Sequence, residues 1–395
     1  MTSIPAFIMI NAGGVGIMRY ISRRLDILKV LKQKSCFLFG PRQTGKSSLV
    51  EHLLGKYRTY NLLETDTFLK LSRAPERLRE EYTAKDKIII IDEIQRLPIL
   101  LNEVHALIES KGVHFLLTGS SARKLRRTGV NLLGGRARVR HLHPLSFCEL
   151  GKQFNLERAI NYGLLPSIYF SDAPEEDLAS YIGLYLKEEI AAEGLVRNIP
   201  AFSRFLEVAA WCNARLMNYT KIANDAQVAR STIQEYVEIL KDTLIAEELP
   251  AWGKSKRRKP ITTSKYYLFD MGVTRMLQNR SLIRVKSPEF GEALESYIFH
   301  ELKCYVDYCQ AGPLNYWRST SGYEVDFILA DEIAIEVKGS EKISYQDLKN
   351  LKALQEEKKL KHYFLVCLEK TARTVSGIQV MPWKQFLELL WEGSL

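Results

Sequence analysis

The chain of 395 residues is 46% hydrophobic and 26% charged, which is the balance of an ordinary globular protein. Its length predicts two or three domains, each with a core of its own. Lysine and arginine outnumber aspartate and glutamate by 56 to 46, so an acidic polymer fits as a partner. The six cysteines form no C-x-x-C pair, which argues against a zinc site and a disulfide framework. No segment is long and apolar enough to span a bilayer, and we expect a cytoplasmic protein.

A glycine-rich loop follows the first predicted strand. Residues 40–47 match the pattern G-x-x-x-x-G-K-[ST], with a strand expected over residues 36–39 and a helix over residues 47–54. In such a loop the backbone N–H groups point at phosphates, Lys46 lies among the β- and γ-phosphates, and the Ser47 hydroxyl binds Mg²⁺. We therefore predict an ATP site formed by Gly40, Pro41, Arg42, Gln43, Thr44, Gly45, Lys46, Ser47 and Ser48.

A second predicted strand ends in two acidic residues. Residues 88–91 are four isoleucines, which indicates a strand covered on both faces, as in the middle of a parallel sheet. Asp92 and Glu93 follow at the edge where open α/β sheets bind ligands. Asp92 is expected to hold Mg²⁺ and Glu93 to polarise the attacking water. Magnesium-dependent ATP hydrolysis is the expected activity.

A third predicted strand, residues 113–117, ends in Thr-Gly-Ser-Ser, and the Ser120 hydroxyl is expected to reach the γ-phosphate or its water. Arg136 precedes another expected strand, residues 137–142. It fits two roles: a finger on the nucleotide of a neighbouring subunit, worth about three to five orders of magnitude in turnover, or an arginine bonded within its own domain. The first role implies a homo-oligomer. Between these strands lies a basic stretch with Arg123, Lys124, Arg126 and Arg127.

The middle of the chain has a helical pattern. Residues 156–199 are helix-like, with a loop at residues 171–174. Three further helices are expected at residues 202–213, 219–226 and 231–240, and the last two are joined by a turn at Gln227 and Val228. Two short helices joined in this way are typical of a helix-turn-helix.

Two expected strands, residues 245–252 and 266–269, flank a basic run at residues 254–259 and complete a winged helix. One interpretation places this module on duplex DNA, with the basic wing on phosphates. The alternative is a protein-docking module whose basic loop is merely solvated. The side chains expected in the major groove are Arg230, Ser231, Thr232 and Gln234.

Two alternating segments near the end predict a hairpin over residues 323–338. With a period of two, Glu324 and Asp326 share one face, and Glu336 and Lys338 point together. Asp326 and Glu336 are expected to hold one or two divalent cations, while Lys338 steadies a water or the developing charge on phosphorus. Glu295, on a helix expected over residues 292–305, is a further candidate.

These motifs together resemble one family, the prokaryotic AAA-superfamily ATPases that carry a C-terminal domain of unknown function with a nuclease-like fold. The resemblance extends from Met18 onward, and residues 1–17 look like an extension. It implies a helical lid after the ATPase core. The motifs that carry it are residues 40–49, 91–95, 117–121, 135–136 and 144–147.

The C-terminal segment resembles the restriction-endonuclease-like fold with its PD-(D/E)xK site. Gly291 and Glu295 match the family's helix, as residues 323–327 and 335–338 match its strands. Glu324 stands where that motif has no fixed residue, so its role stays open. The fold is often kept for binding alone, so the resemblance implies the fold more firmly than nuclease turnover.

We therefore predict an α/β protein with a P-loop NTPase parallel-sheet core (residues 18–155), a helical lid and winged helix (156–280) and a restriction-endonuclease-like α/β domain (281–395). The leading function is Mg²⁺-dependent ATP hydrolysis coupled to DNA binding, with metal-dependent cleavage left open. The expected cofactors are ATP and Mg²⁺, with a second Mg²⁺ or Mn²⁺ in the C-terminal domain. The alternative is an ATP-switched interaction protein whose nuclease-like domain is a non-catalytic docking module. A third reading is nucleotide binding with negligible turnover.

Overall fold

The computed structural model describes residues 6–11, 14–121, 125, 133–186, 196 and 198–395. The chain forms two compact units, Met1–Leu145 with Asp242–Leu244, and Ser146–Lys241 with Ile245–Leu395. None of the helices that the structure describes is both long enough and apolar enough to cross a membrane.

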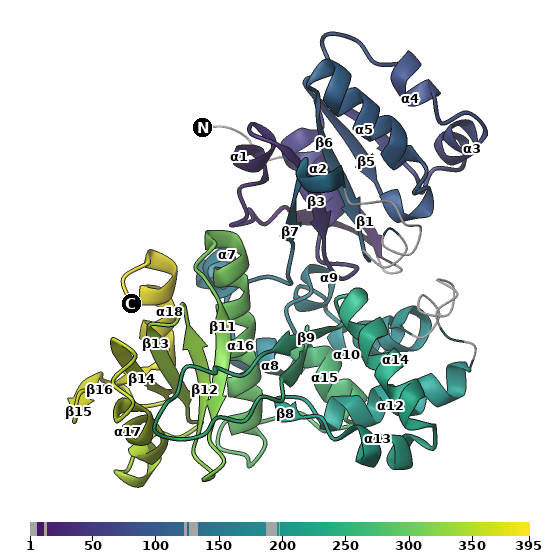
Figure 1. Cartoon of the computed structure of the whole chain (residues 1–395). Helices are drawn as coiled ribbons and strands as arrows, with labels where there is room; N and C mark the ends of the chain where they lie inside the picture. The colour runs from purple at the N-terminus through teal and green to yellow at the C-terminus, as the bar shows by residue number, and fades with distance from the viewer. Residues whose placement is uncertain (1–5, 12–13, 122–124, 126–132, 187–195, 197) are drawn as a thin grey trace. The chain divides into compact units, whose positions relative to one another are not determined.

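The first unit contains a five-stranded sheet in the order β4-β5-β6-β3-β7, and every neighbouring pair is parallel (Figure 1). The prediction of an α/β fold with a parallel-sheet core is confirmed. The strands are β3 (Ser35–Phe39), β4 (Arg58–Asn61), β5 (Ile88–Asp92), β6 (His114–Gly119) and β7 (Ala137–His141). The helices between them are α1 (Ile27–Leu31), α2 (Lys46–Leu54), α3 (Thr65–Arg73), α4 (Arg77–Glu80) and α5 (Leu100–Lys111), with short 3-10 turns at Ile94–Arg96 and Leu133–Gly135.

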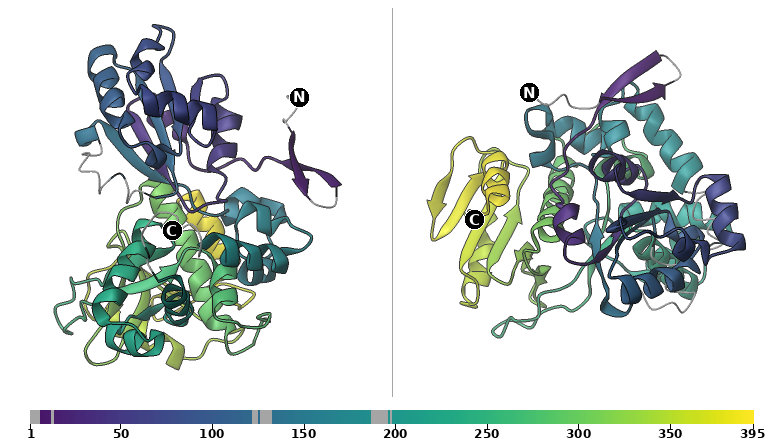
Figure 2. Two further views of the ribbon diagram at one scale, coloured as in Figure 1. Left: turned by 90° about the vertical axis from the view of Figure 1, so that its right-hand side faces the viewer. Right: turned by 90° about the horizontal axis from the view of Figure 1, so that it is seen from above.

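The core of this unit explains why its strands are almost wholly apolar. Ile89, Ile90 and Ile91 are fully buried, because helices cover both faces of the sheet. Phe37 and Phe115 on neighbouring strands are also fully buried. A separate antiparallel pair, β1 (Ala6–Asn11) and β2 (Gly14–Arg19), precedes the sheet (Figure 2).

The second unit begins with helices and a small antiparallel sheet in the order β8-β10-β9. Asn198 and Asn218 cap two of these helices, each side chain accepting a backbone N–H three residues further on. Gln227, with a φ of 55°, ends the helix before it in the left-handed conformation. The predicted turn between the two short helices is therefore where the sequence placed it.

This part of the second unit contains helices and the three short strands of the small sheet. The helices are α7 (Phe147–Leu150), α8 (Leu156–Tyr162), α9 (Pro166–Tyr169), α10 (Pro174–Ser180), α12 (Ile199–Trp211), α13 (Tyr219–Ala226), α14 (Arg230–Asp242) and α15 (Met271–Leu277), with a 3-10 turn at Gly151–Gln153 and a π-helix at Tyr181–Leu186. The strands are β8 (Arg215–Leu216), β9 (Ala246–Leu249) and β10 (Lys265–Leu268).

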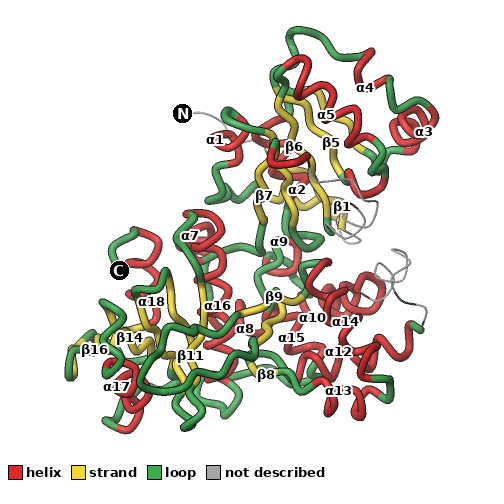
Figure 3. Tube along the Cα trace, viewed as in Figure 1, coloured by secondary structure: helices red, strands yellow, loops and turns green. Residues whose placement is uncertain are grey.

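The rest of the second unit is a six-stranded mixed sheet in the order β11-β12-β13-β14-β16-β15, with helices packed against it (Figure 3). The predicted hairpin is present as β12 and β13, and Ala330 and Asp331 make its turn with positive φ angles of 56° and 61°. The strands are β11 (Leu314–Arg318), β12 (Glu324–Leu329), β13 (Ile333–Val337), β14 (His362–Cys367), β15 (Arg373–Val375) and β16 (Ile378–Pro382). The helices are α16 (Phe290–Cys309), α17 (Lys349–Gln355) and α18 (Trp383–Glu392), with a 3-10 turn at Gln346–Leu348.

The basic loop, residues 254–259, does not extend freely between its flanking strands as a wing would. The Glu357 carboxylate accepts the backbone N–H groups of residues 256, 257 and 258 at 2.8, 2.9 and 3.0 Å. The Lys254 ammonium pairs with Asp331 at 2.8 Å, so this end of the loop is held against the six-stranded sheet. Lys256, Arg257 and Lys259 keep exposed side chains.

Candidate functional site

The predicted phosphate loop connects β3 to α2 in the first unit. Gln43 and Gly45 have positive φ angles of 60° and 90°, so the backbone curls tightly before the helix begins. A Cβ atom on Gly40 would lie 2.3 Å from the Leu142 carbonyl oxygen, which leaves room only for glycine. Ser47 and Ser48 are exposed beside the curl. A tightly curled backbone that leads directly into a helix is the geometry in which backbone N–H groups can receive an anion.

An arginine that the sequence analysis left without a role supports this loop. The Arg23 guanidinium donates to the Thr44 carbonyl at 2.6 Å and to the His143 carbonyl at 2.6 Å. It thus ties the loop to the segment that follows β7. No spacing rule connects residues this far apart, so the sequence carried no signal for this contact.

Lys46 is buried within the curl, with only 6% of its surface exposed. Its ammonium donates to the carbonyl oxygens of Gly40 at 2.7 Å and Pro41 at 3.0 Å. Burial lowers the pKa of Lys46 to about 8, and the Glu93 and Asp92 carboxylates oppose this shift. Lys46 therefore titrates closer to neutral pH than an ordinary lysine.

The strand register brings the acids of β5 to the same edge as the loop. Because β6 pairs in parallel with β5 on one side and β3 on the other, the carboxyl ends of all three strands meet. The Ser47 hydroxyl donates to one Asp92 carboxylate oxygen at 3.1 Å, and the Thr118 hydroxyl donates to the other. The Glu93 backbone N–H in turn donates to the Thr118 hydroxyl at 3.2 Å. Two oxygen groups expected to hold Mg²⁺ are thus adjacent.

Glu93 lies beside Asp92 with 8% of its surface exposed and a positive φ of 60°. The Gln95 side-chain amide donates both to the Glu93 carboxylate and, at 3.2 Å, to the Ser120 hydroxyl. Gln95 therefore links two predicted site residues, although the sequence analysis gave it no role. The short 3-10 turn after β5 returns Gln95 toward Glu93, which no pattern of apolar residues reveals.

Arg136 lies at the opposite end of the sheet from the phosphate loop. The next residue, Ala137, pairs with Ser35 at the amino end of β3, whereas the loop follows the carboxyl end. The Arg136 guanidinium forms an ion pair with Glu109. This contact corresponds to the interpretation of an arginine bonded within its own domain, and the finger role stays a prediction. The basic stretch of Arg123, Lys124, Arg126 and Arg127 lies outside the described residues.

In the second unit, four carboxylates gather around β12, β13 and α16, and we call them the acidic cluster: Glu295, Glu324, Asp326 and Glu336. Asp326 accepts the Val337 backbone N–H at 2.8 Å, and Glu336 accepts the Lys338 ammonium at 2.6 Å. The second Glu336 oxygen is buried with no hydrogen-bond partner among the described residues. The side chains that the strand alternation predicted to share a face thus lie in one region.

Two residues of β10 that the sequence analysis left without a role also belong to this region. Lys265, 3% exposed, places its ammonium 2.5 Å from Glu324 and 3.6 Å from Glu295. The Tyr267 hydroxyl donates to Glu295 at 2.7 Å. The open question about Glu324 is answered in part, since it pairs with Lys265.

Burial dominates the electrostatics of the acidic cluster. Burial first, and the Asp326 carboxylate second, raise the pKa of Glu295 to about 7 and that of Glu336 to about 8. Burial works against the charge of Lys265, but Glu295, Asp326 and Glu324 together raise its pKa above the ordinary range. Within the described part of the chain, no group of three or more His, Cys, Asp or Glu residues is arranged to hold a metal ion.

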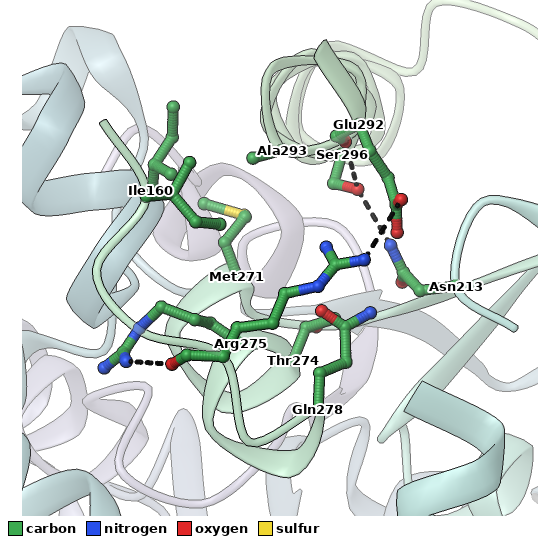
Figure 4. A pocket seen from close by; sticks show the side chains of 11 residues that line it. Ile160, Asn213, Met271, Thr274, Arg275, Gln278, Glu292, Ala293 and Ser296 are labelled. Carbon is green, nitrogen blue, oxygen red and sulfur yellow. Dashed lines mark hydrogen bonds and ion pairs between the residues drawn. The ribbon is translucent and has the colours of Figure 1, made fainter. Parts of the chain in front are cut away.

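A small pocket lies elsewhere in the second unit, between α15 and α16 (Figure 4). The Asn213 amide donates to the Ser296 hydroxyl at 2.8 Å, and Arg280 lies 3.5 Å from the Glu292 carboxylate. These polar groups bond one another, so the pocket reads as a packing feature of the unit.

Comparisons with known proteins support the prediction of an N-terminal AAA-type domain and of a C-terminal domain of unknown function. Residues 32–151 match the model of an AAA domain, residues 153–283 match a domain of unknown function (DUF8612), and residues 290–386 match another (DUF4143). The chain contains an AAA domain and a C-terminal DUF4143 domain. This confirms the AAA assignment and the presence of a C-terminal domain of unknown function.

The curated relatives are uncharacterized proteins. One from Mycobacterium tuberculosis is 27% identical over 301 residues, covering 73% of this chain and 66% of the relative, so the match spans just under two thirds of that protein. One from Haemophilus influenzae is 27% identical over 349 residues, covering 78% of this chain and 81% of the relative. One from Methanocaldococcus jannaschii is 25% identical over 347 residues, covering 80% and 76%. A solved structure of the replication initiator DnaA bound to AMPPCP and single-stranded DNA aligns with a TM-score of 0.29 and 13% identity, covering 56% of this chain and 90% of that one.

Proposed function

We propose that the first unit binds ATP with Mg²⁺ and hydrolyses it. The observation that carries this proposal is the 3.1 Å contact between Ser47 and Asp92, with buried Glu93 at the same sheet edge. The match of residues 32–151 to an AAA domain supports it. A nucleotide-binding loop alone would not require the buried acid beside it.

The residues at this edge fit a magnesium ion, because a hydroxyl and a carboxylate are the hard oxygen ligands that Mg²⁺ prefers. Ser47 and Asp92 would hold it, and the ion would neutralise charge on the phosphates. Lys46 exchanges its carbonyl acceptors for phosphate oxygens when nucleotide binds. Glu93 orients water, and Gln95 fixes the direction of the Glu93 carboxylate while contacting Ser120.

Phosphate release from ATP by the full chain tests this proposal. Glu93→Gln should lower turnover by about a hundredfold or more, because a positioned acid–base group contributes at least that much. Nucleotide affinity should stay near the wild-type value, since Glu93 does not belong to the phosphate loop. Glu51→Gln, an exposed change on α2, is the matched control. Unchanged turnover in the Glu93 variant would favour nucleotide binding with negligible hydrolysis.

We also propose that α14 contacts duplex DNA. The order α12, β8, α13, α14, β9, β10 is that of a winged helix, in which the last helix enters the major groove. Arg230, Ser231 and Gln234 are exposed at the start of α14, and Thr232 is half-buried. The basic loop is held by Glu357 and Asp331, so we assign it a smaller part in phosphate contact than the sequence suggested.

Salt dependence of binding to a labelled duplex tests the DNA proposal. Affinity should fall steeply between low and moderate salt, because phosphate contacts release counterions. Arg230→Ala should weaken binding, whereas Lys221→Ala on the neighbouring helix α13 serves as an exposed control of equal charge change. Binding that is insensitive to salt would favour the docking module instead. DNA-stimulated ATP hydrolysis would separate a DNA-coupled ATPase from an ATP-switched interaction protein.

For the C-terminal domain we propose the restriction-endonuclease-like fold, supported by the antiparallel β11-β12-β13 run followed by parallel β14 and β16. Asp326 lies on β12 and Glu336 on β13, and Lys338 directly follows β13. The three-domain division and the homo-oligomer with Arg136 as a finger also stay proposals. We assign no cleavage step to the acidic cluster, because each of its carboxylates is engaged through at least one oxygen by the protein's own cations, hydroxyl or N–H groups.

A further inference from the structure

The acidic cluster receives a cation from a different part of the chain. Its carboxylates lie on α16, β12 and β13, within the DUF4143 match, whereas Lys265 lies on β10, within the preceding match. The side chain of Lys265 is 4% exposed, so its ammonium is removed almost wholly from water. A lysine is rarely buried to this degree unless it is paired.

The contacts of Lys265 leave it little freedom to move. Its ammonium lies 2.5 Å from Glu324 and 3.6 Å from Glu295, and it stands 5.4 Å from the centre of the Tyr316 ring. The Tyr267 hydroxyl, two residues along the same strand, holds Glu295 from the same face. Removing the ammonium would leave buried carboxylates without their counter-charge, which is costly.

Three of the four carboxylates have further contacts within the protein, although the second Glu336 oxygen has no hydrogen-bond partner among the described residues. Glu324 contacts Arg318 at 3.3 Å, Asp326 accepts the Val337 N–H, and Glu336 accepts Lys338. A divalent ion needs several of these oxygens at once and would be repelled by an ammonium so close to them. The residues therefore do not fit the second Mg²⁺ or Mn²⁺ that the sequence led us to expect.

We propose that Lys265 is the resident cation of the acidic cluster and excludes divalent ions from it. Lys265 is thus a specificity-determining residue. It sets which cation the C-terminal domain accepts, and it joins β10 to that domain. ATP hydrolysis by the first unit is a separate property and can succeed or fail independently.

Mn²⁺ binding to the full chain without nucleotide tests this proposal, with free Mn²⁺ measured by its electron paramagnetic resonance signal. Wild type and Asp326→Asn should bind the same amount of Mn²⁺. Lys265→Met should gain one site, at least about tenfold tighter than any wild-type site, because a unit charge is removed beside the carboxylates. That site should disappear in the double variant K265M/D326N.

Two further variants separate specific from general effects. Lys303→Met removes another lysine that is paired with acids, Glu247 and Asp307, and should bind Mn²⁺ as wild type does. Lys265→Arg keeps the charge and should also gain no site. A Mn²⁺ site in wild type that Asp326→Asn removes would overturn the proposal, and this comparison holds even if Lys265→Met does not fold. A folded Lys265→Met that gains no site would overturn it equally.

Discussion

The buried Lys46 ammonium gives nucleotide binding a specific dependence on pH. Burial is the main cause that lowers the pKa of Lys46 to about 8 in the nucleotide-free protein. Phosphate oxygens of a bound nucleotide add negative charge beside the ammonium and therefore raise its pKa. Binding thus requires the protonated form, and raising the pH must weaken it.

The size of the effect follows from the fraction of Lys46 that is protonated. With a pKa of about 8, roughly nine tenths of Lys46 is charged at about pH 7 and roughly one tenth at about pH 9. Affinity for ATP should therefore fall about tenfold across this window. Phosphate groups titrate near pH 6, so the nucleotide's own ionisation lies below the window.

A fluorescent ATP analogue titrated into the full chain at a series of pH values measures this dependence. Lys46→Arg stays charged up to at least about pH 12 and should show no fall in affinity between about pH 7 and pH 9. Glu93→Gln removes a carboxylate that supports the ammonium, so the midpoint of the fall should move to lower pH. Affinity that stays constant in wild type, or falls equally in Lys46→Arg, would refute the reasoning.

Three further predictions concern stability and are checked by urea denaturation. Gly40→Ala places a Cβ atom 2.3 Å from the Leu142 carbonyl oxygen and should cost about 1–3 kcal/mol, whereas Gly253→Ala meets open space and should change stability by less than about 0.5 kcal/mol. Asn218→Ala removes the cap of α13 and should cost about 1 kcal/mol; no loss would show that the cap is redundant. Burial raises the pKa of Asp270 from 3.8 to about 6, so the folded state keeps a proton that the unfolded state releases. Stability should fall by about 2 kcal/mol as pH rises from about 4 to about 6, and a rise over that range would contradict the assignment.

The sheet edge where the phosphate loop meets Asp92 and Glu93 could be predicted from sequence, because its parts depend on local patterns. Four isoleucines in a row specify a strand buried on both faces, and Ile89, Ile90 and Ile91 are indeed fully buried. Since parallel strands all end at one edge, Asp92 had to lie near the loop. The order of the strands was not predictable, because the insertion of β6 between β3 and β5 depends on long-range pairing.

The basic loop shows where local pattern misleads. A run of lysine and arginine between two strands resembles a solvated wing, and nothing nearby indicates otherwise. The acid that fixes the loop, Glu357, lies about a hundred residues further along the chain and accepts three of its backbone N–H groups. Charge patterning describes which side chains prefer water, but it does not identify a distant acceptor for the backbone.

Lys265 and Tyr267 show that local pattern also fails to identify distant partners in the acidic cluster. Their spacing places both on one face of β10, and both in fact contact Glu295. The sequence contains that alternation, yet it cannot show that the face is covered by α16 and β12. Lys265 lies within residues 153–283, whereas the four carboxylates lie within residues 290–386. Neither segment therefore holds both the acidic cluster and its cation. A C-terminal domain expressed alone would therefore expose uncompensated carboxylates, so metal binding by such a fragment would not describe the intact protein.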